Sequence, residues 1–381
     1  MRKLPLSRFL CSLVLLMIPS TPSLRAEIQV ELAEPPIPIP PVKPGGEDSE
    51  VSAIEALGPD LFLLGADEEK SLLIADLEGR SVEIEKQLSP GSFSKKPKWE
   101  ALAKDEKGFF YVVGSHNVNP DDPEAIEKLE ARSNLVRFSI DGEVSRPGEL
   151  TLKSPVILDL KDALDREGLY KAGNPGATRA KIEGLTVRAV PIPGGASRQE
   201  LVVGLREPFE CSEGEPPSAV SCIRAYAADL SNVPGQPTDV APIPLDLKLL
   251  FTFGAEAREG VPAKLSSLVH SPEWGGFLVL TSTEDGSNKF HGNTLWFLPD
   301  SEAKGKEMGK AQKLWVFGLV PGGGLAPEAK AEGLAILPGK QETEKPDRLR
   351  LVIAYDNDSV PEGGSHKPSF LQLVTLVRWP D

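Results

Sequence analysis

A repeated unit of short apolar segments is the feature that most constrains how this chain can fold. The pattern of glutamate, small residue and leucine recurs ahead of four such segments, and a weaker copy, "SSL", falls at Ser267. Each copy leads through a turn into a strongly apolar run, such as "LFLLGAD", "FFYVVGSH" or "ELVVGLR". Runs of this kind, bounded by Gly, Pro, Asn or Asp, are typical of strands. The glutamates of the four full copies are Glu55, Glu100, Glu183 and Glu332.

Each unit also has a third apolar segment, and four units have a candidate fourth, as in "SVEIEKQL" and "KLWVFGLV". Four antiparallel strands repeated around an axis form a β-propeller. The 35 Gly and 36 Pro residues of the 381-residue chain suit many short strands better than long helices. We therefore predict an all-β propeller of five four-stranded blades over residues 51–381. A sixth blade in the long interval between Glu100 and Glu183 is the alternative.

The expected architecture also includes two short helical insertions and an N-terminal strand that completes the fifth blade. The segments 121–132 and 160–170 are predicted to be short helices. The fifth unit lacks a fourth strand, and "EIQVELAE", residues 27–34, is the candidate to supply it. The proline-rich segment that follows is extended and semi-rigid. We therefore expect residues 27–50 to close the ring by adding a strand to the last blade and covering its edge.

The first 26 residues have the order of a secretory signal peptide: three basic residues, a ten-residue apolar run, and a small residue at Ala26. Ten apolar residues are too few to span a bilayer. We expect export to the periplasm or the extracellular space, with no membrane insertion after cleavage, and a monomer. Cleavage leaves 38 basic against 56 acidic residues, a net charge of −18, which argues against nucleic acid as a partner.

Two cysteines, Cys211 and Cys222, remain after the predicted cleavage site. Two closely spaced cysteines in an exported protein are expected to form a disulfide. The turn-rich segment "SEGEPPSAVS" between them suits a bridged loop. A zinc site is disfavoured, because two sulfurs without a nearby histidine do not complete a zinc coordination shell.

The strand order predicts where the functional residues gather. The first strand of each blade lies beside the central channel, so the glutamates that start these strands should converge at one mouth. The ends of the second strands reach the same mouth, and several long insertions follow them, which is typical of a binding face. The residues at those ends are Asp67, His116, Arg206, Thr283 and Asp356.

The sequence leaves the role of these carboxylates open. They could accept backbone N–H bonds from the next blade and tie the ring together. Their mutual repulsion could instead be balanced by Arg206, or by a hard cation such as Ca²⁺ bound at Glu183, Glu332 and Asp356. One or two of them could also act directly in catalysis. His116 is either a general base or ligand, or a hydrogen-bonded structural residue.

Several ordered motifs resemble an uncharacterised bacterial family, number thirty-six sixteen among the domains of unknown function. These motifs are "YVVGSHNVNPD", "KIEGLTVRAV" with "ELVVGLREPF", and "AEGLAIL" with "LVIAYDND". The Glu-Gly-Leu starts are also similar to those of phytase-like propellers, a resemblance that implies calcium and phosphorylated ligands at the channel face. The phosphate-binding lysines and arginines of a phytase are not evident, and only Arg206 is well placed.

Two functional hypotheses follow. The first is a module that binds a small molecule or a protein at the acidic channel mouth. The alternative is a calcium-dependent hydrolase of phosphoesters or related substrates, which requires an activated water. Calcium is the one candidate cofactor. Signatures of nucleophile elbows, zinc proteases, P-loops and dinucleotide-binding folds are missing from the sequence.

Overall fold

The computed structural model describes residues 27–42, 50–67, 69–79, 81–119, 121–169, 180–208, 210–211, 220–234, 242–285, 290–317, 329–339, 347–356 and 369–379. The predicted signal peptide, residues 1–26, lies outside this part of the chain. Within the described residues, no helix is long and apolar enough to cross a membrane.

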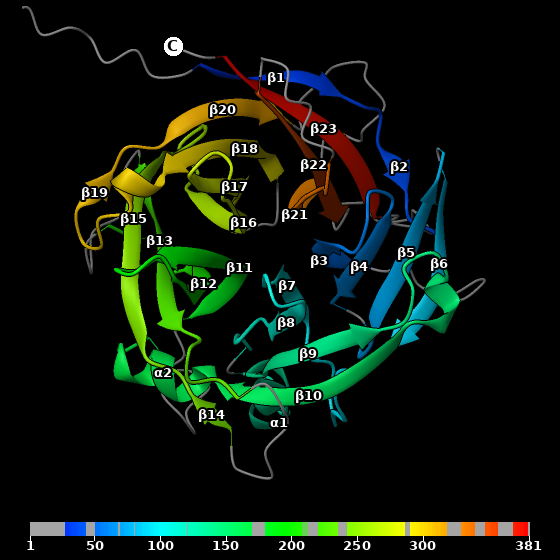
Figure 1. Cartoon of the computed structure of the whole chain (residues 1–381). Coiled ribbons are helices and arrows are strands. Elements are labelled where there is room, and N and C mark those ends of the chain that lie inside the picture. The colour runs from blue at the N-terminus through cyan, green and yellow to red at the C-terminus, as the bar shows by residue number, and fades with distance from the viewer. Residues whose placement is uncertain are drawn as a thin grey trace, which may run out of the picture.

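Five largely antiparallel sheets surround a central axis, which confirms the five-bladed propeller predicted from the sequence (Figure 1). Blade 1 consists of β3 (Val51–Ala56), β4 (Leu61–Ala66), β5 (Leu72–Glu78) and β6 (Ser81–Leu88). Blade 2 consists of β7 (Trp99–Lys104), β8 (Phe109–Gly114), β9 (Leu135–Asp141) and β10 (Thr151–Asp159), with the short parallel strand β14 (Ile243–Pro244) at its edge.

The other three blades follow the same order from the channel outward. Blade 3 consists of β11 (Lys181–Pro191), β12 (Ser197–Glu207), β13 (Val220–Asp229) and β15 (Leu247–Glu256), edged by β19 (Met308–Gly309). Blade 4 consists of β16 (Ala263–Ser271), β17 (Gly276–Glu284), β18 (Phe290–Pro299) and β20 (Gln312–Phe317). Blade 5 contains β21 (Lys330–Ile336), β22 (Asp347–Asp356) and β23 (Phe370–Arg378).

The N-terminal segment supplies the missing fourth strand of blade 5, as predicted. The strand β1 (Ile28–Ala33) pairs antiparallel with β23, and β2 (Ile37–Pro38) adds two further residues to the same edge. Ile28, Ile37 and Ile39 are buried by this pairing. Both ends of the chain therefore contribute to one blade, and the ring is closed (Figure 1).

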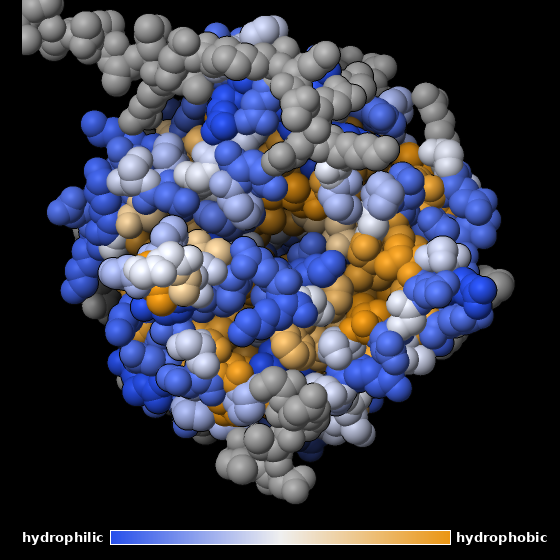
Figure 2. Space-filling model, viewed as in Figure 1, coloured by the Kyte–Doolittle hydropathy of each residue, from blue (hydrophilic) through white to orange (hydrophobic). Residues whose placement is uncertain are grey.

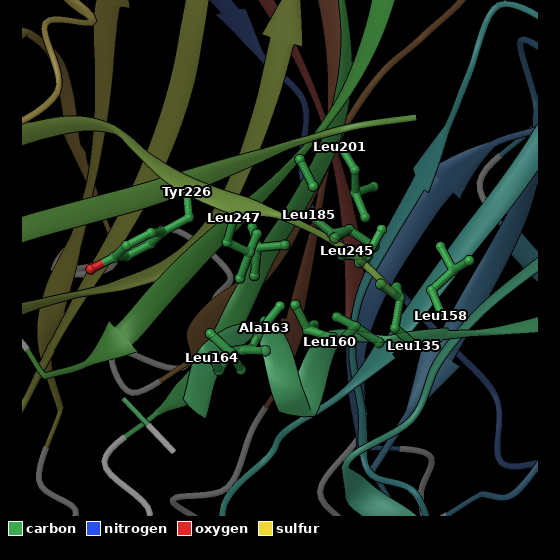
Figure 3. Packing of buried hydrophobic residues seen from close by; sticks show 14 of the residues in the cluster. Leu135, Leu158, Leu160, Ala163, Leu164, Leu185, Leu201, Tyr226, Leu245 and Leu247 are labelled. Carbon is green, nitrogen blue, oxygen red and sulfur yellow. The ribbon is translucent and has the colours of Figure 1, made fainter. Parts of the chain in front are cut away.

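The hydrophobic core is divided into five clusters, each between two neighbouring blades. This arrangement explains why the central part of the second strand of every blade is largely apolar, since both of its faces are covered. The cluster between blades 2 and 3 also includes α2 (Leu160–Arg166), whose Leu160, Ala163 and Leu164 pack beneath leucines of both blades (Figure 3).

The insertions contain the two predicted helices in shortened form. The helix α1 (Ala125–Arg132) follows the end of β8, and α2 follows β10 directly. Two 3₁₀ turns occur at Pro147–Glu149 and Asp300–Glu302. The predicted disulfide is present and joins Cys211 to Cys222 in β13, with a Cα–Cα distance of 5.0 Å.

Candidate functional site

A β-bulge occurs at the same position near the start of all five inner strands. In each blade the register slips by one residue on the inner strand, so that one residue has no direct partner on the second strand. A bulge of this kind re-aims a side chain and is common next to functional sites. The five bulged residues are Ser52, Glu100, Glu183, Ser266 and Glu332.

The small residue and the leucine of the repeated motif have a packing role between blades. A Cβ atom added to Gly184 would lie 2.7 Å from the side chain of Leu268, which belongs to the motif of the next blade. A Cβ atom on Gly333 would likewise lie 2.8 Å from Ile54 of blade 1. The small residue therefore makes room for the aliphatic side chain of the following blade, while the glutamate before it is left to face the channel.

The structure corrects two assignments made from the motif. Glu55 does not join the other glutamates: it pairs with Leu63, three residues beyond Ser52 along β3, and lies toward the far end of the strand, within electrostatic reach of Lys104. Residues 55–57 fit the sequence motif "EAL", but β3 begins at Val51, so the bulge falls at Ser52 and not at Glu55. In blade 4 the equivalent residue is Ser266 and not Ser267.

The ends of the second strands approach the same mouth, with a shift of one residue from the predicted position in blades 2 and 4. Asp67, Arg206 and Asp356 occupy the predicted positions, each directly after the residue that faces the start of the bulge. In blade 2 that position is filled by Ser115, so His116 lies one residue further on. In blade 4 the equivalent residue is Ser282 rather than Thr283.

His116 is buried and has a left-handed backbone conformation with φ 56°. Its backbone N–H donates a hydrogen bond to the backbone carbonyl of Arg132. Burial first, and the charge of Lys161 second, lower the pKa of its imidazole to about 3. The side chain is therefore neutral at physiological pH. Since Lys161 belongs to α2, the side chain of His116 lies within electrostatic reach of that helix.

Between blades 3 and 5, buried carboxylates and cations alternate around the mouth. Arg206 donates to Ser282 at 3.1 Å and to the carbonyl of Leu265 at 3.2 Å, and pairs with Glu284 at 3.0 Å. Its Nε lies 3.7 Å from Glu183. These contacts connect blade 3 to blade 4 through one guanidinium group, because Leu265, Ser282 and Glu284 all belong to blade 4.

Lysines complete the alternation in blades 3 and 5. The Nζ atom of Lys181 lies 2.8 Å from Oε1 of Glu183, and Lys330 forms a close ion pair with Glu332. Lys330 also lies 3.8 Å from Glu284 of blade 4. Burial would raise the pKa of Glu332, but the charge and hydrogen bond of Lys330, together with the charges of Lys181 and Arg206, outweigh burial and the pKa is lowered. Glu332 is therefore ionised beside Lys330 in the folded protein.

Blade 1 is connected to both of its neighbours by hydrogen bonds at this mouth. The hydroxyl of Ser52 lies 2.9 Å from Oε2 of Glu332 in blade 5 and 3.0 Å from Oδ1 of Asp67 in its own blade. Lys98 of blade 2 donates to the other oxygen of Asp67 at 2.8 Å. The resulting charged ring consists of Ser52, Asp67, Lys98, Glu100, Lys181, Glu183, Arg206, Glu284, Lys330 and Glu332.

Glu100 differs from every other carboxylate of the charged ring. It is 4% exposed, yet it makes no hydrogen bond and no ion pair with the residues that the structure describes. Burial, followed by the charges of Asp67, Glu183 and Glu332, raises the pKa of Glu100 well above its ordinary value, and Lys181 only partly offsets this. Glu100 therefore stays protonated, and able to donate a hydrogen bond, up to a higher pH than an ordinary glutamate.

A pocket of about 320 Å³ opens beside Glu100. The centre of the disc is visibly hollowed in the surface view (Figure 2). The pocket lies between blades 1, 2 and 3, and its wall is polar apart from one valine. Its lining residues are Asp67, Lys98, Glu100, Ser115, Asn117, Val118, Asn119, Arg132 and Lys181.

The lysines of the charged ring and the role of Arg132 were missed in the sequence, although a signal for the lysines was present. The segments "KWEAL", "KIEGL" and "KAEGL" share a lysine two residues before the glutamate, and "KLSSL" has the same spacing. A longer repeat, lysine-x-glutamate-small-leucine, would have placed Lys98, Lys181 and Lys330 at the mouth. Arg132 has no such signal, because it comes from the helix α1.

The carboxylates predicted to bind a cation are already balanced by side chains in two cases. Glu183 and Glu332 have lysine or arginine partners, while Asp356 is buried at the end of β22. Within the described part of the chain, no group of three or more His, Cys, Asp or Glu side chains is arranged to hold a metal ion. Calcium at these residues stays a prediction from the sequence.

Fold and site together define a class: a five-bladed β-propeller with a ring of buried charges at one channel mouth. No family model and no curated protein sequence matches the chain. Among solved structures it is similar to an endo-arabinase from Bacteroides thetaiotaomicron, at 10% identity and a TM-score of 0.38, over 89% of this chain and 96% of that one.

Two further solved structures align at comparable levels. The Dos1 propeller has 10% identity and a TM-score of 0.34, over 86% of this chain and 78% of that one. Sqt1 from Saccharomyces cerevisiae has 10% identity and a TM-score of 0.32, over 88% and 97% of the two chains. Likeness at this level carries no argument about what this protein binds or catalyses.

Proposed function

We propose that this protein is an exported binding module that holds a small ligand in the pocket beside Glu100. The observation that supports the proposal is a buried carboxyl group that has no partner in the described chain and lines a polar pocket. Buried polar groups in folded proteins are almost always hydrogen-bonded, so a partner from outside the chain is expected here. A volume of about 320 Å³ is at the small end of the range for small-molecule sites.

The position of the pocket supports a binding role as well. The carboxylates of blades 3, 4 and 5 at this mouth are paired with cations, which makes that half of the charged ring a structural element. The pocket adjoins α1 and the segment after β8, which form an insertion in blade 2. A regular framework with one irregular, open position is the usual arrangement of a site grafted on a repeat fold.

A thermal-shift screen tests the binding role. The purified protein is heated with defined sets of sugars, sugar acids, amino acids and nucleotides, alongside the variant Asn117→Trp, which fills the pocket, and Lys306→Trp, an exposed control. At least one compound should raise the melting temperature of the wild type and of Lys306→Trp but not of Asn117→Trp. If every stabilising compound acts equally on Asn117→Trp, the ligand binds elsewhere and the proposal fails.

The same samples test the calcium-dependent hydrolase predicted as the alternative. Calcium chloride should raise the melting temperature, and p-nitrophenyl phosphate should be hydrolysed in its presence, if that alternative holds.

Export rests on the N-terminal sequence pattern, and the disulfide between Cys211 and Cys222 is compatible with it. N-terminal sequencing of the native protein should begin near Glu27, and a chain that starts at Met1 would contradict export by cleavage.

A further inference from the structure

Two side chains in the pocket wall have no hydrogen-bond partner among the described residues. The carboxyl group of Glu100 is one, and the side-chain amide of Asn117 is the other. The backbone of Asn117 is bonded to Ser115 and to Arg132, so its position is fixed while its amide is left for another partner. Polar groups that are withdrawn from solvent normally have partners, so a ligand that bonds to both groups is expected.

The three cationic side chains of the same wall already have acceptors within the chain. The Nζ atom of Lys98 lies 2.8 Å from Oδ2 of Asp67. The Nζ atom of Lys181 lies 2.8 Å from Oε1 of Glu183. Arg132 donates from Nη1 to a backbone carbonyl of the segment after β8, at 2.8 Å. An anionic ligand would therefore compete with acceptors that belong to the protein, and these cations do not select one.

A cationic ligand is disfavoured by the same lysines. Lys98 and Lys181 both act electrostatically on Glu100, so both lie near the carboxyl group that an ammonium group would approach. Like charges repel in a partly buried site more strongly than they do in water. The pocket is therefore suited to an uncharged ligand.

The remaining lining residues favour a polar ligand without an aromatic ring. Ser115 and Asn119 add a hydroxyl and a second amide, and Val118 is the one apolar side chain among the described residues of the wall. An apolar ligand would leave the polar groups without partners, at a cost in binding free energy. A flat ring such as a nucleobase would find no aromatic side chain to stack on among these lining residues.

Hydroxyl groups match both of the side chains that lack a partner in the described chain. A hydroxyl donates to a carboxylate and accepts from a protonated carboxyl group, so its bond with Glu100 forms in either protonation state. The amide of Asn117 likewise donates and accepts. A ligand with several hydroxyl groups therefore bonds to both residues, and no particular charge on Glu100 is required.

We infer that the pocket binds a small neutral polyol, a sugar alcohol or a monosaccharide, whose hydroxyl groups bond to Glu100 and Asn117. The inference rests on the proposed function and names its ligand class. A volume of about 320 Å³ suits one such molecule rather than an oligosaccharide. Each lysine of the wall has three N–H donors, so the N–H groups not used by Asp67 and Glu183 are available to further hydroxyl groups.

Calorimetric titration of the purified protein at pH 7.5 tests the ligand class. The neutral probes are sorbitol, D-glucose and myo-inositol. Sodium gluconate and N-methylglucamine hydrochloride keep the hydroxylated chain of sorbitol but carry a negative or a positive charge at one end, and 1,6-hexanediol has six carbons without the inner hydroxyl groups. The tightest of the neutral probes should bind at least tenfold more tightly than gluconate, N-methylglucamine or hexanediol.

Four variants test whether the polyol lies where the inference places it. Glu100→Met and Asn117→Leu keep the approximate size of each side chain but remove its hydrogen bonds, so each should weaken polyol binding at least tenfold. Glu100→Gln has an amide that donates and accepts, so it should recover most of the binding lost in Glu100→Met. Glu85→Met, on the exposed side of β6, is the matched control and should bind as the wild type does. Circular dichroism checks the folding of each variant, and two sites are used so that misfolding at one does not decide the result.

Each other outcome overturns the inference in a recognisable way. Equal binding of sorbitol, gluconate and N-methylglucamine would show that the pocket does not select an uncharged ligand. Tightest binding of gluconate would show an anion site, and tightest binding of N-methylglucamine, lost in Glu100→Gln, would show that Glu100 is the counter-ion of a cation. Unchanged polyol affinity in both Glu100→Met and Asn117→Leu would place the polyol elsewhere. If none of the neutral probes binds, the ligand class is wrong, while the screen with Asn117→Trp still decides the binding role.

Discussion

The same lysine-x-glutamate sequence behaves differently in two parts of the charged ring. In blades 3 and 5 the lysine is the first residue of the inner strand and pairs with the glutamate of its own blade, as Lys330 does with Glu332. In blade 2 the lysine precedes the strand, has a left-handed backbone with φ 51°, and pairs with Asp67 of blade 1 instead. Glu100 is left without an ion pair in the described part of the chain, and the pocket opens beside it.

The difference shows that one repeat position can serve two purposes. Where the lysine folds back on its own glutamate, the pair helps to hold the blades in place and is closed to ligands. In blade 2 the lysine pairs instead with a carboxylate of the neighbouring blade, and the glutamate becomes available. Asp67 belongs to the blade that precedes Lys98, and it is therefore the residue that makes blade 2 different. The blades that precede Lys181 and Lys330 have serines at the equivalent position, Ser115 and Ser282, and a serine offers the lysine no carboxylate.

The largest expected effect comes from removing the lysine of a closed pair. Lys330→Met leaves Glu332, which is 3% exposed, as an uncompensated buried charge. Breaking a buried ion pair in this way costs about 3–5 kcal/mol. The free energy of unfolding, measured in urea, should fall by this amount, whereas the exposed control Lys306→Met should change it by less than about 0.5 kcal/mol.

Lys98→Met sharpens the comparison, because its partner Asp67 is more accessible to solvent than Glu332 is. The side chain of Asp67 is 17% exposed, against 4% for that of Glu332. Water can replace part of the lost contact, so the expected loss is about 1 kcal/mol. Equal losses in Lys98→Met and Lys330→Met would mean that the two lysines contribute alike to the ring, and the contrast between the blades would disappear.

Replacing the glutamates themselves, at pH 7.5, should have an effect between those of Lys330→Met and Lys98→Met. Glu332→Gln and Glu183→Gln each remove the charge that balances a buried cation, and a hydrogen bond to a charged group is worth about 1.5–3 kcal/mol. Both should lower the free energy of unfolding by about 2 kcal/mol. Glu100→Gln removes no ion pair and should leave stability unchanged or raise it. A loss in Glu100→Gln as large as in Glu332→Gln would contradict the assignment of Glu100 as the free carboxyl.

The pH dependence of stability provides a finer test of Glu100. Its pKa is raised in the folded protein, so the folded state binds more protons than the unfolded state above the ordinary value of 4.5. Stability therefore falls as pH rises from 4.5 toward the folded pKa, by about 1.4 kcal/mol per pH unit across that interval. The difference between wild type and Glu100→Gln should show this slope. A flat difference between pH 4.5 and 8 would show that Glu100 ionises normally.

The smallest effect is expected at the opposite end of the inner strands, at Glu55. Burial raises the pKa of Glu55 to about 7, although the N–H of Ala56 bonds to the carboxylate and lowers it. The side chain is only half-buried, so screening by solvent should limit the effect to about 1 kcal/mol. Glu55→Gln should remove a loss of stability that occurs between pH 4.5 and 7. A steeper dependence at Glu55 than at Glu100 would reverse the proposed contrast between the two ends.

Much of the fold could be predicted from the sequence, because it depends on local patterns. Apolar runs of strand length, separated by turn residues, specify the five blades, and the incomplete fifth unit indicates the closing strand. The disulfide follows from composition and spacing. The bulge could not be predicted in the same way: its position depends on how two strands pair, and the letters "EAL" at Glu55 occur in a different register.

The site was predicted in outline for a similar reason. Strand order alone places Glu100, Glu183, Glu332 and Arg206 at one mouth. Which carboxyl is free depends on contacts between blades, and these are set by features that leave little trace in sequence, such as the left-handed backbone of Lys98. His116 shows the same limit, because it lies one residue beyond the equivalent position, where its side chain is buried and within electrostatic reach of α2.

Closure of the ring by β1 has a consequence for the folding kinetics. The pairing of Ile28 with Arg378 joins residues that are separated by almost the whole chain, and Val51 donates to Ser369 in the same region. Contacts of such high sequence separation lower the folding rate, because the entropy of closing the long intervening loop is lost before the contact contributes. Blades 1 to 4 can form their hairpins while the chain is being made, but blade 5 must wait for both ends. Until then β23 presents an unpaired edge, so we expect the last folding step to be slow and to be the stage at which this protein is most prone to aggregate.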